Sequence, residues 1–117
     1  MKNVLNYLLL IFCILLIPIT YAAEYEKSIR TKVTWVGAYH SSSASGDVLI
    51  RVEKPSENCS AGYLLLEGTL GLNSSLSIAM SAFHSNSNVE IHAYTAKAWR
   101  GSGSSKWCIV EGIHLVK

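Results

Sequence analysis

The sequence predicts a mainly β fold: a five-stranded barrel that carries one helix and one disulfide. Three observations lead to this prediction. Five segments have the apolar spacing of strands, one segment has the spacing of a helix, and two cysteines remain once an N-terminal leader is set aside. The composition agrees, because the chain contains only 2 prolines and is rich in Ser, Gly, Thr and β-branched residues.

Residues 1–23 are predicted to be a secretory signal peptide. Lys2 precedes an apolar run, and small residues follow that run at 22–23. The uninterrupted apolar stretch 8–17 is about half of the roughly 20 residues that a membrane-spanning helix needs, so a membrane anchor is the weaker alternative. We therefore expect residues 24–117 to form one secreted or periplasmic domain without a membrane span.

The cysteines favour the same compartment. Cys13 lies in the leader, which leaves Cys59 and Cys108 as a pair. In an oxidising compartment such a pair predicts one disulfide. Closing a loop of this length is worth on the order of 4 kcal/mol in the chain-entropy model. Two free thiols or a metal site are the alternatives, but neither cysteine has a Cys or His neighbour at zinc-ligand spacing, so we expect no metal.

Alternation of apolar and polar residues predicts the strands. In segment 31–39, Trp35 shares one side with Val33 and Tyr39, which predicts that Trp35 packs in the core. In the last strand Gly112 indicates a bulge. Four further strands are predicted at 48–52, 63–66, 89–96 and 107–116.

A helix is predicted between the third and fourth strands. The apolar side chains of residues 73–84 recur with the period of an amphipathic helix, at Leu76, Ala79, Met80 and Phe83. Asn73, Ser74 or Ser75 is expected to cap it. The resulting order, β-β-β-α-β-β, is the layout of the OB-fold, an oligomer-binding barrel. A helix-on-sheet α+β sandwich is the alternative arrangement of the same elements.

The sequence contains no recognisable catalytic motif. The four histidines are scattered, and no Gly-x-Ser-x-Gly nucleophile turn occurs. After removal of the leader, nine Lys and Arg face eight Asp and Glu without a basic cluster, which argues against a nucleic-acid partner. We therefore expect a binding protein without a cofactor, not an enzyme.

The candidate binding residues come from two polar segments. Trp99 stands beside Arg100 in a glycine-rich stretch, and we expect its indole to be exposed, where a flat apolar face suits the C–H groups of a sugar. Trp107, beside Cys108, is expected to serve packing instead. Hydroxyl groups from the serine-rich segment would add hydrogen bonds, so the predicted glycan-binding residues are Ser43, Ser45, Trp99 and Arg100. A solvated serine loop is the simpler alternative.

Two stretches resemble the binding subunits of bacterial AB5-type toxins, in particular those of subtilase cytotoxin and typhoid toxin. They are the helix, turn and strand of residues 79–94 that lead to Trp99, and Ser45-Gly46 ahead of an apolar strand. The resemblance spans residues 45–99. It implies an OB-fold, a homopentamer, a catalytic A subunit as partner, and recognition of a host glycan, sialylated in that family, with Ser45 as one contact.

The expected function is therefore that of a secreted binding module for host cell-surface glycans. The alternative is a small extracytoplasmic interaction protein, such as an inhibitor or a subunit that covers an envelope protein. An oligomeric ring favours the first function, and a monomer or a hetero-complex favours the second.

Overall fold

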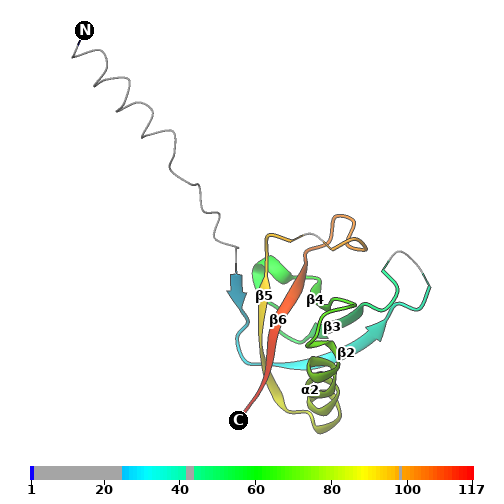
Figure 1. Ribbon diagram of the computed structural model, residues 1–117. Helices are drawn as coiled ribbons and strands as arrows, with labels where there is room; N and C mark the ends of the chain where they lie inside the picture. Colours follow the sequence, from blue (N-terminus) through cyan, green and yellow to red (C-terminus); the bar gives the residue numbers. More distant parts are fainter. Residues whose placement is uncertain (2–24, 42–43, 98) are drawn as a thin grey trace.

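The structure, a computed structural model, describes residues 1, 25–41, 44–97 and 99–117 and is mainly β (Figure 1). Nearly all of the predicted signal peptide therefore lies outside the described residues, and so does Ser43. Among the described residues, no helix is both long enough and apolar enough to cross a membrane.

Six strands and one α-helix make up the described part of the chain. The strands are β1 (Tyr25–Lys27), β2 (Thr31–Ala38), β3 (Val48–Val52), β4 (Gly62–Leu65), β5 (Asn88–Tyr94) and β6 (Trp107–Val116). The helix is α2 (Leu72–Ser85), and a short 3-10 turn, η1 (Glu57–Cys59), precedes β4. The predicted segments at 48–52 and 107–116 match β3 and β6 in full.

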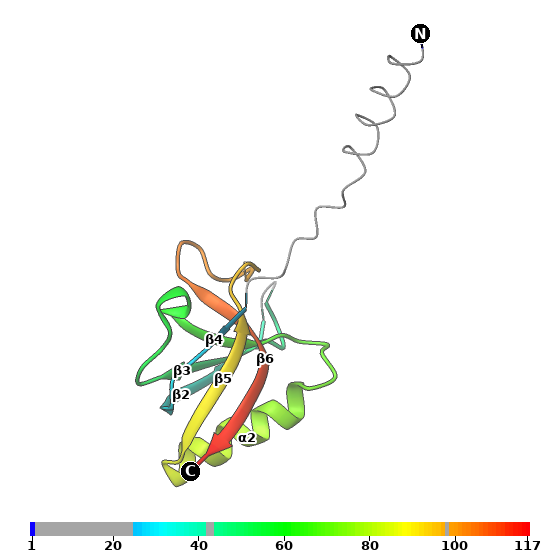
Figure 2. The same ribbon diagram turned by 90° about the vertical axis from the view of Figure 1, so that its left-hand side faces the viewer.

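Hydrogen bonds join the strands into a closed ring. The order β5-β2-β3-β4-β6 returns to β5, and only the β4–β6 pair is parallel. Together with a helix between β4 and β5, this ring confirms the predicted OB-fold-like barrel and excludes the sandwich. Both views place α2 at one end of the barrel and the loop after β5 at the opposite end (Figures 1 and 2).

The short strand β1 was not predicted, because three residues are too few to show a period. It pairs with the C-terminal half of β5, and β2 begins on the same edge of β5 further along. Ser28 fills the step between β1 and β2: its N–H donates to Ile91 O at 2.8 Å, and the Ile91 N–H donates to Ser28 Oγ at 2.8 Å. Backbone groups that would be unpaired at this irregularity are thereby satisfied.

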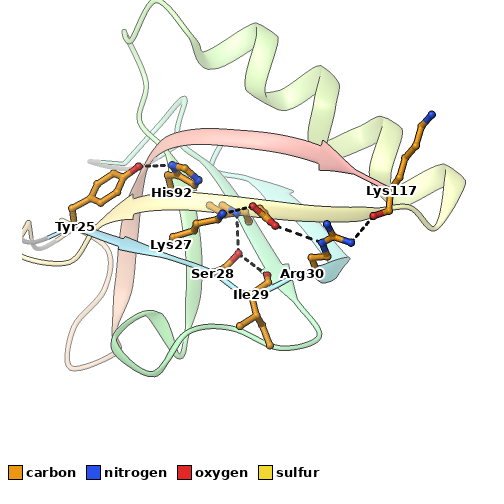
Figure 3. Close-up of polar contacts among 9 residues, drawn as sticks. Tyr25, Lys27, Ser28, Ile29, Arg30, His92 and Lys117 are labelled. Atoms are coloured by element: carbon orange, nitrogen blue, oxygen red, sulfur yellow. Dashed lines mark hydrogen bonds and ion pairs between the residues drawn. The ribbon is translucent and has the colours of Figure 1, made fainter.

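Charged side chains fasten β1 to the outer surface of β5 (Figure 3). Lys27 Nζ lies 2.7 Å from the Glu90 carboxylate, and Arg30 Nε lies 3.6 Å from it. The hydrogen bond from Lys27 lowers the pKa of the Glu90 carboxyl below its ordinary value. The Tyr25 hydroxyl bonds His92 Nδ1 beside them. β1 is therefore held by polar contacts and not by burial of a large apolar face.

The interior of the barrel is filled by side chains from β2 to β6, and α2 covers one end. Val89, Ile91 and Ala93 of β5 point inward as predicted, and each is fully buried. From the helix, Ala79 and Ala82 reach the core. The predicted helical stripe is therefore rotated: Phe83 lies at its edge and is 42% exposed.

The start of the helix also differs from the prediction. Its N-cap is Gly71, and no side chain caps the free N–H groups there. Asn73, Ser74 and Ser75 lie inside the helix instead, because α2 already begins at Leu72. At the other end, Asn86 takes the left-handed conformation and its N–H bonds Ala82 O, a common way to end a helix.

A β-bulge reverses the predicted orientation of Trp35. The pairing between β2 and β3 shifts register between Val33 and Trp35. One extra residue in a strand turns every later side chain to the opposite face. Val33 therefore points into the core, whereas Trp35 lies on the outer surface and is 43% exposed. Val36, the next residue, packs against the core in its place. The prediction that Trp35 and Tyr39 lie inward is wrong for this reason.

A second apolar cluster lies on the outer face of β3 and β4. Leu49 and Leu64 form its floor, and Ala44 and Trp99, from the loops after β2 and β5, cover it. Both faces of β3 and β4 are consequently buried at this point, and Trp99 is only 4% exposed. The prediction that Trp99 is exposed is therefore wrong: its indole is the cover of this cluster.

The predicted disulfide is confirmed. Cys59, at the end of η1, and Cys108, in the second position of β6, form a bond across a sequence separation of 49 residues. Both cysteines are buried. The bond joins the segment before β4 to the strand that pairs with β4 in parallel, so it fixes the one parallel contact of the ring.

Candidate functional site

A cleft of about 450 Å³ opens on the outer face of β2 and β3, below the loop after β5. We call it the aromatic cleft, because its walls are formed by Trp35, Tyr39, Arg51, Trp99 and Trp107. Its volume lies within the range of small-molecule sites. OB-fold proteins bind ligands on the face of their second and third barrel strands, here β3 and β4, and on the loops after the first and fourth strands; the cleft adjoins this surface through β3 and these two loops.

Arg51 stands between two indoles at the centre of the aromatic cleft. Its guanidinium carbon lies 5.1 Å from the ring centre of Trp35 and 5.6 Å from that of Trp107. Both distances are within the range of cation–π attraction. Among the described residues the Arg51 guanidinium has no ion pair, so its N–H groups are available to an acceptor.

Neighbouring strands bring this stack together. Trp35 and Arg51 face each other in the register of β2 and β3, and Trp107 pairs with Gly62 of β4. A Cβ atom on Gly62 would lie 2.8 Å from Trp107 Cζ3, so only glycine lets the Trp107 ring cross over β4 toward Arg51. Gly62 also has a φ of +131°, which disfavours any other residue.

Trp35 rests on its own strand in a similar way. A Cβ atom on Gly37 would lie 2.3 Å from Trp35 Cη2. The indole therefore lies against Gly37 of its own strand and remains 43% exposed in the lining of the cleft, where Tyr39 is 42% exposed. A flat, half-exposed indole with a fixed orientation is a surface on which a ring-shaped ligand can stack.

Asp47 holds the two loops that border the cleft. Its carboxylate is fully buried; Oδ1 accepts the Glu67 N–H at 2.8 Å and Oδ2 accepts the Trp99 indole N–H at 2.8 Å. Arg100 Nη2 lies 3.9 Å from Oδ2. A buried carboxylate is tolerated only with such partners. The loop after β2 and the loop after β5 are thereby fixed to one another.

The four predicted glycan-binding residues are distributed unevenly around this site. Trp99 forms a buried wall of the cleft, through an edge-to-face contact with Tyr39 at 5.5 Å between ring centres. Arg100 is exposed beside Asp47. Ser45 is exposed and donates to His40 O at 2.8 Å, away from the lining of the cleft. Ser43 lies outside the described residues, and the ligand contacts of all four residues stay predictions.

Sequence reasoning missed Arg51, although one signal could have found it. The alternation of β3 placed Arg51 on the outer face, and the OB-fold uses that face of its second strand for binding. Trp107 was expected to pack beside the disulfide, but it is half-buried and lines the cleft. The bulge that exposes Trp35 has no signature in the sequence.

The histidines were expected to be scattered, but two of them meet. His92 and His114 lie side by side on the outer surface of β5 and β6, with ring centres 4.8 Å apart. This surface is separate from the lining of the aromatic cleft. Within the described residues, no three His, Cys, Asp or Glu side chains group as a metal site would require.

Comparisons of the chain with models of protein families, with curated proteins and with solved structures found no match. The functional assignment therefore rests on the geometry and chemistry of the aromatic cleft.

Proposed function

We propose that this protein is an exported, non-enzymatic binding module that recognises glycans in the aromatic cleft. The observation that carries the proposal is the stack of Trp35, Arg51 and Trp107 on the outer face of the barrel. Sugars bind to proteins through stacking of C–H groups on aromatic faces and through many hydrogen bonds. The cleft combines half-exposed indoles with the N–H donors of Arg51.

The guanidinium favours a sugar that carries a carboxylate. Its planar N–H edge matches two carboxylate oxygens, and charge-assisted hydrogen bonds are about twice as strong as neutral ones. The described lining of the cleft includes no carboxylate, histidine or cysteine. Nothing there repels an acidic sugar or resembles an acid–base pair, which supports binding without catalysis.

The likeness to toxin binding subunits extends the proposal to the biological setting. It supports a host cell-surface glycan with a sialic acid, assembly as a homopentamer and a catalytic A subunit as partner. The disulfide and the lack of a spanning helix among the described residues are compatible with an extracytoplasmic protein. Measurement of the mass in solution tests the assembly: about five times the mature mass supports a ring.

A protein ligand is the second candidate function. Trp, Tyr and Arg dominate the binding energy of protein–protein interfaces, and Trp35, Tyr39 and Arg51 are gathered on one surface. Such a protein would be a monomer or part of a hetero-complex, and its cleft would bind no free sugar.

Calorimetric titration with sialyllactose and with lactose tests glycan recognition. We expect sialyllactose to bind more tightly, and Trp35→Ala to weaken its binding about tenfold or more through loss of the stacking face. Arg51→Gln should remove the preference for sialyllactose over lactose, because the Arg51 guanidinium is the group that binds the carboxylate of the sialic acid. Phe83→Ala is the matched control, because Phe83 is equally exposed at the far end of the barrel. Absence of sugar binding by the wild-type protein would contradict the proposal.

A further inference from the structure

A second hollow adjoins the aromatic cleft. Its volume is about 330 Å³, and we call it the lysine cleft because Lys97 and Lys106 line it. Trp107, Ser102 and Ser105 line both hollows. The two clefts are therefore neighbours, with Trp107 and two serines of the loop after β5 at their shared boundary.

Every charged side chain that lines these two clefts is a cation. Arg51 belongs to the aromatic cleft, and Lys97 and Lys106 belong to the lysine cleft. Within the described part of the chain, none of these three cations forms an ion pair with a carboxylate. Lys97 Nζ lies 4.8 Å above the Tyr94 ring, a cation–π contact that supplies no carboxylate partner.

The two clefts contain cations alone, whereas the chain as a whole is nearly neutral. Without the leader, the chain has nine basic and eight acidic residues. The ion pairs of the described residues lie outside the two clefts. Lys27 and Arg30 pair with Glu90, and Arg100 pairs with Asp47. Unpaired cations in two neighbouring clefts of an otherwise balanced protein indicate a ligand with several negative charges.

We propose that the ligand is an extended glycan chain with repeated acid groups, which runs from the aromatic cleft across Trp107 into the lysine cleft. This inference rests on the proposed glycan function and adds the length and charge of the ligand. One sugar stacks on Trp35 with its acid group at Arg51. Later sugars place their carboxylate or sulfate groups beside Lys97 and Lys106.

Single-stranded nucleic acid also combines rings with negative charges, and OB-folds bind it. A glycan is favoured because the two clefts have only three unpaired cations, whereas phosphate-tracking surfaces present many. Ser102 and Ser105 supply hydroxyl groups, which match sugar hydroxyls better than a phosphate backbone.

Titration with galacturonic acid and with its hexamer tests the length, and a sulfated dextran hexamer compares sulfate with carboxylate. We expect either hexamer to bind more than tenfold tighter than the monomer. Lys97→Gln/Lys106→Gln should weaken hexamer binding roughly three- to tenfold and leave monomer binding unchanged, the range expected for two exposed cations. Lys32→Gln/Lys117→Gln removes the same charge at the α2 end and is the control.

Each other outcome overturns part of the reasoning. If sialyllactose binds but neither galacturonic acid nor either hexamer does, this inference fails and the glycan function stands; if sialyllactose does not bind either, both fail. If monomer and hexamer bind with equal affinity, or the Lys97→Gln/Lys106→Gln protein binds the hexamer normally, the extended ligand alone is wrong. If hexathymidylate binds more tightly than both acidic hexamers and is weakened by the same double variant, the ligand is a nucleic acid and not a glycan.

Discussion

Replacement of Asp47 by asparagine should loosen both loops that border the aromatic cleft. The Asp47 carboxylate is fully buried and accepts two hydrogen bonds of 2.8 Å, from the Glu67 N–H and from the Trp99 indole N–H. An asparagine offers one oxygen and one NH₂ group. Whichever way it turns, its oxygen accepts one of the two N–H groups and its NH₂ group faces the other, so one buried N–H loses its acceptor and the buried NH₂ group has none.

The magnitude follows from these contacts. An unsatisfied buried polar group costs about 1–3 kcal/mol. The ion pair with Arg100 adds little, because the Arg100 side chain is 58% exposed and its Nη2 lies 3.9 Å from Asp47 Oδ2. We therefore expect Asp47→Asn to lower the free energy of unfolding by about 2–4 kcal/mol. For a domain of this size the melting temperature should fall by about 10–20 °C.

Urea denaturation followed by circular dichroism measures this loss, and a double-mutant cycle with Trp99→Phe assigns it. Phenylalanine keeps an aromatic ring but removes the N–H donor, so the two changes should be strongly non-additive, with a coupling of about 1–2 kcal/mol. A loss below 1 kcal/mol for Asp47→Asn, or additive effects in the cycle, would refute the role of Asp47 as the link between the loops.

Three further perturbations test other parts of the structure. Replacing both bridge cysteines by serine should lower the free energy of unfolding by about 4 kcal/mol in the same denaturation assay, because the unfolded chain gains the freedom of the open loop. Gly37→Ala should push the Trp35 ring away from β2, so the affinity for sialyllactose, measured by calorimetry, should fall about tenfold. The free energy of unfolding should fall by less than about 1 kcal/mol, because the Trp35 side chain is exposed. The pKa of the Glu90 carboxyl is lowered in the folded protein, mainly by the hydrogen bond from Lys27. The stability that this carboxylate contributes is therefore fully present above pH 4.5, its ordinary pKa, and is lost as the pH falls through its pKa in the folded protein. Lys27→Gln should therefore reduce the loss of stability that occurs as the pH falls below 4.5, as measured by denaturation at each pH.

Each of these perturbations has a control or a contradicting result. If a thiol reductant leaves the denaturation midpoint unchanged, the disulfide does not contribute the predicted free energy of unfolding. Gly68→Ala is the control for Gly37→Ala: its φ of +79° makes alanine strained, but no side chain lies within 4 Å, so stability should fall while sugar binding stays normal. An identical pH profile for the wild-type and Lys27→Gln proteins would show that the Lys27–Glu90 contact contributes nothing to stability.

The sequence was sufficient to predict the barrel, its long strands and the disulfide. These features follow from periodicity and from cysteine count, which act over many residues and tolerate local error. Residues 89–93 illustrate this, because the alternation assigned Val89, Ile91 and Ala93 to the core and the structure agrees. A fold that depends on such averaged signals is accessible from one sequence.

The candidate site depended on single residues and was harder to predict. One bulge after Val33 decides that Trp35 is outside the barrel, and bulges depend on pairing between strands that a single segment does not reveal. Trp99 follows a glycine-poor strand and precedes a glycine-rich turn, yet its environment is set by Asp47, 52 residues earlier. Contacts of this separation leave no periodic trace.

The three tryptophans provide the most direct test of glycan recognition in the aromatic cleft. Their indole N–H signals can be followed separately by ¹⁵N NMR while sialyllactose is added. We predict large shifts for Trp35 and Trp107, which form the stack with Arg51, and a small shift for Trp99, whose N–H is buried against Asp47. Unchanged Trp35 and Trp107 signals at saturating sugar would contradict this location of the binding site.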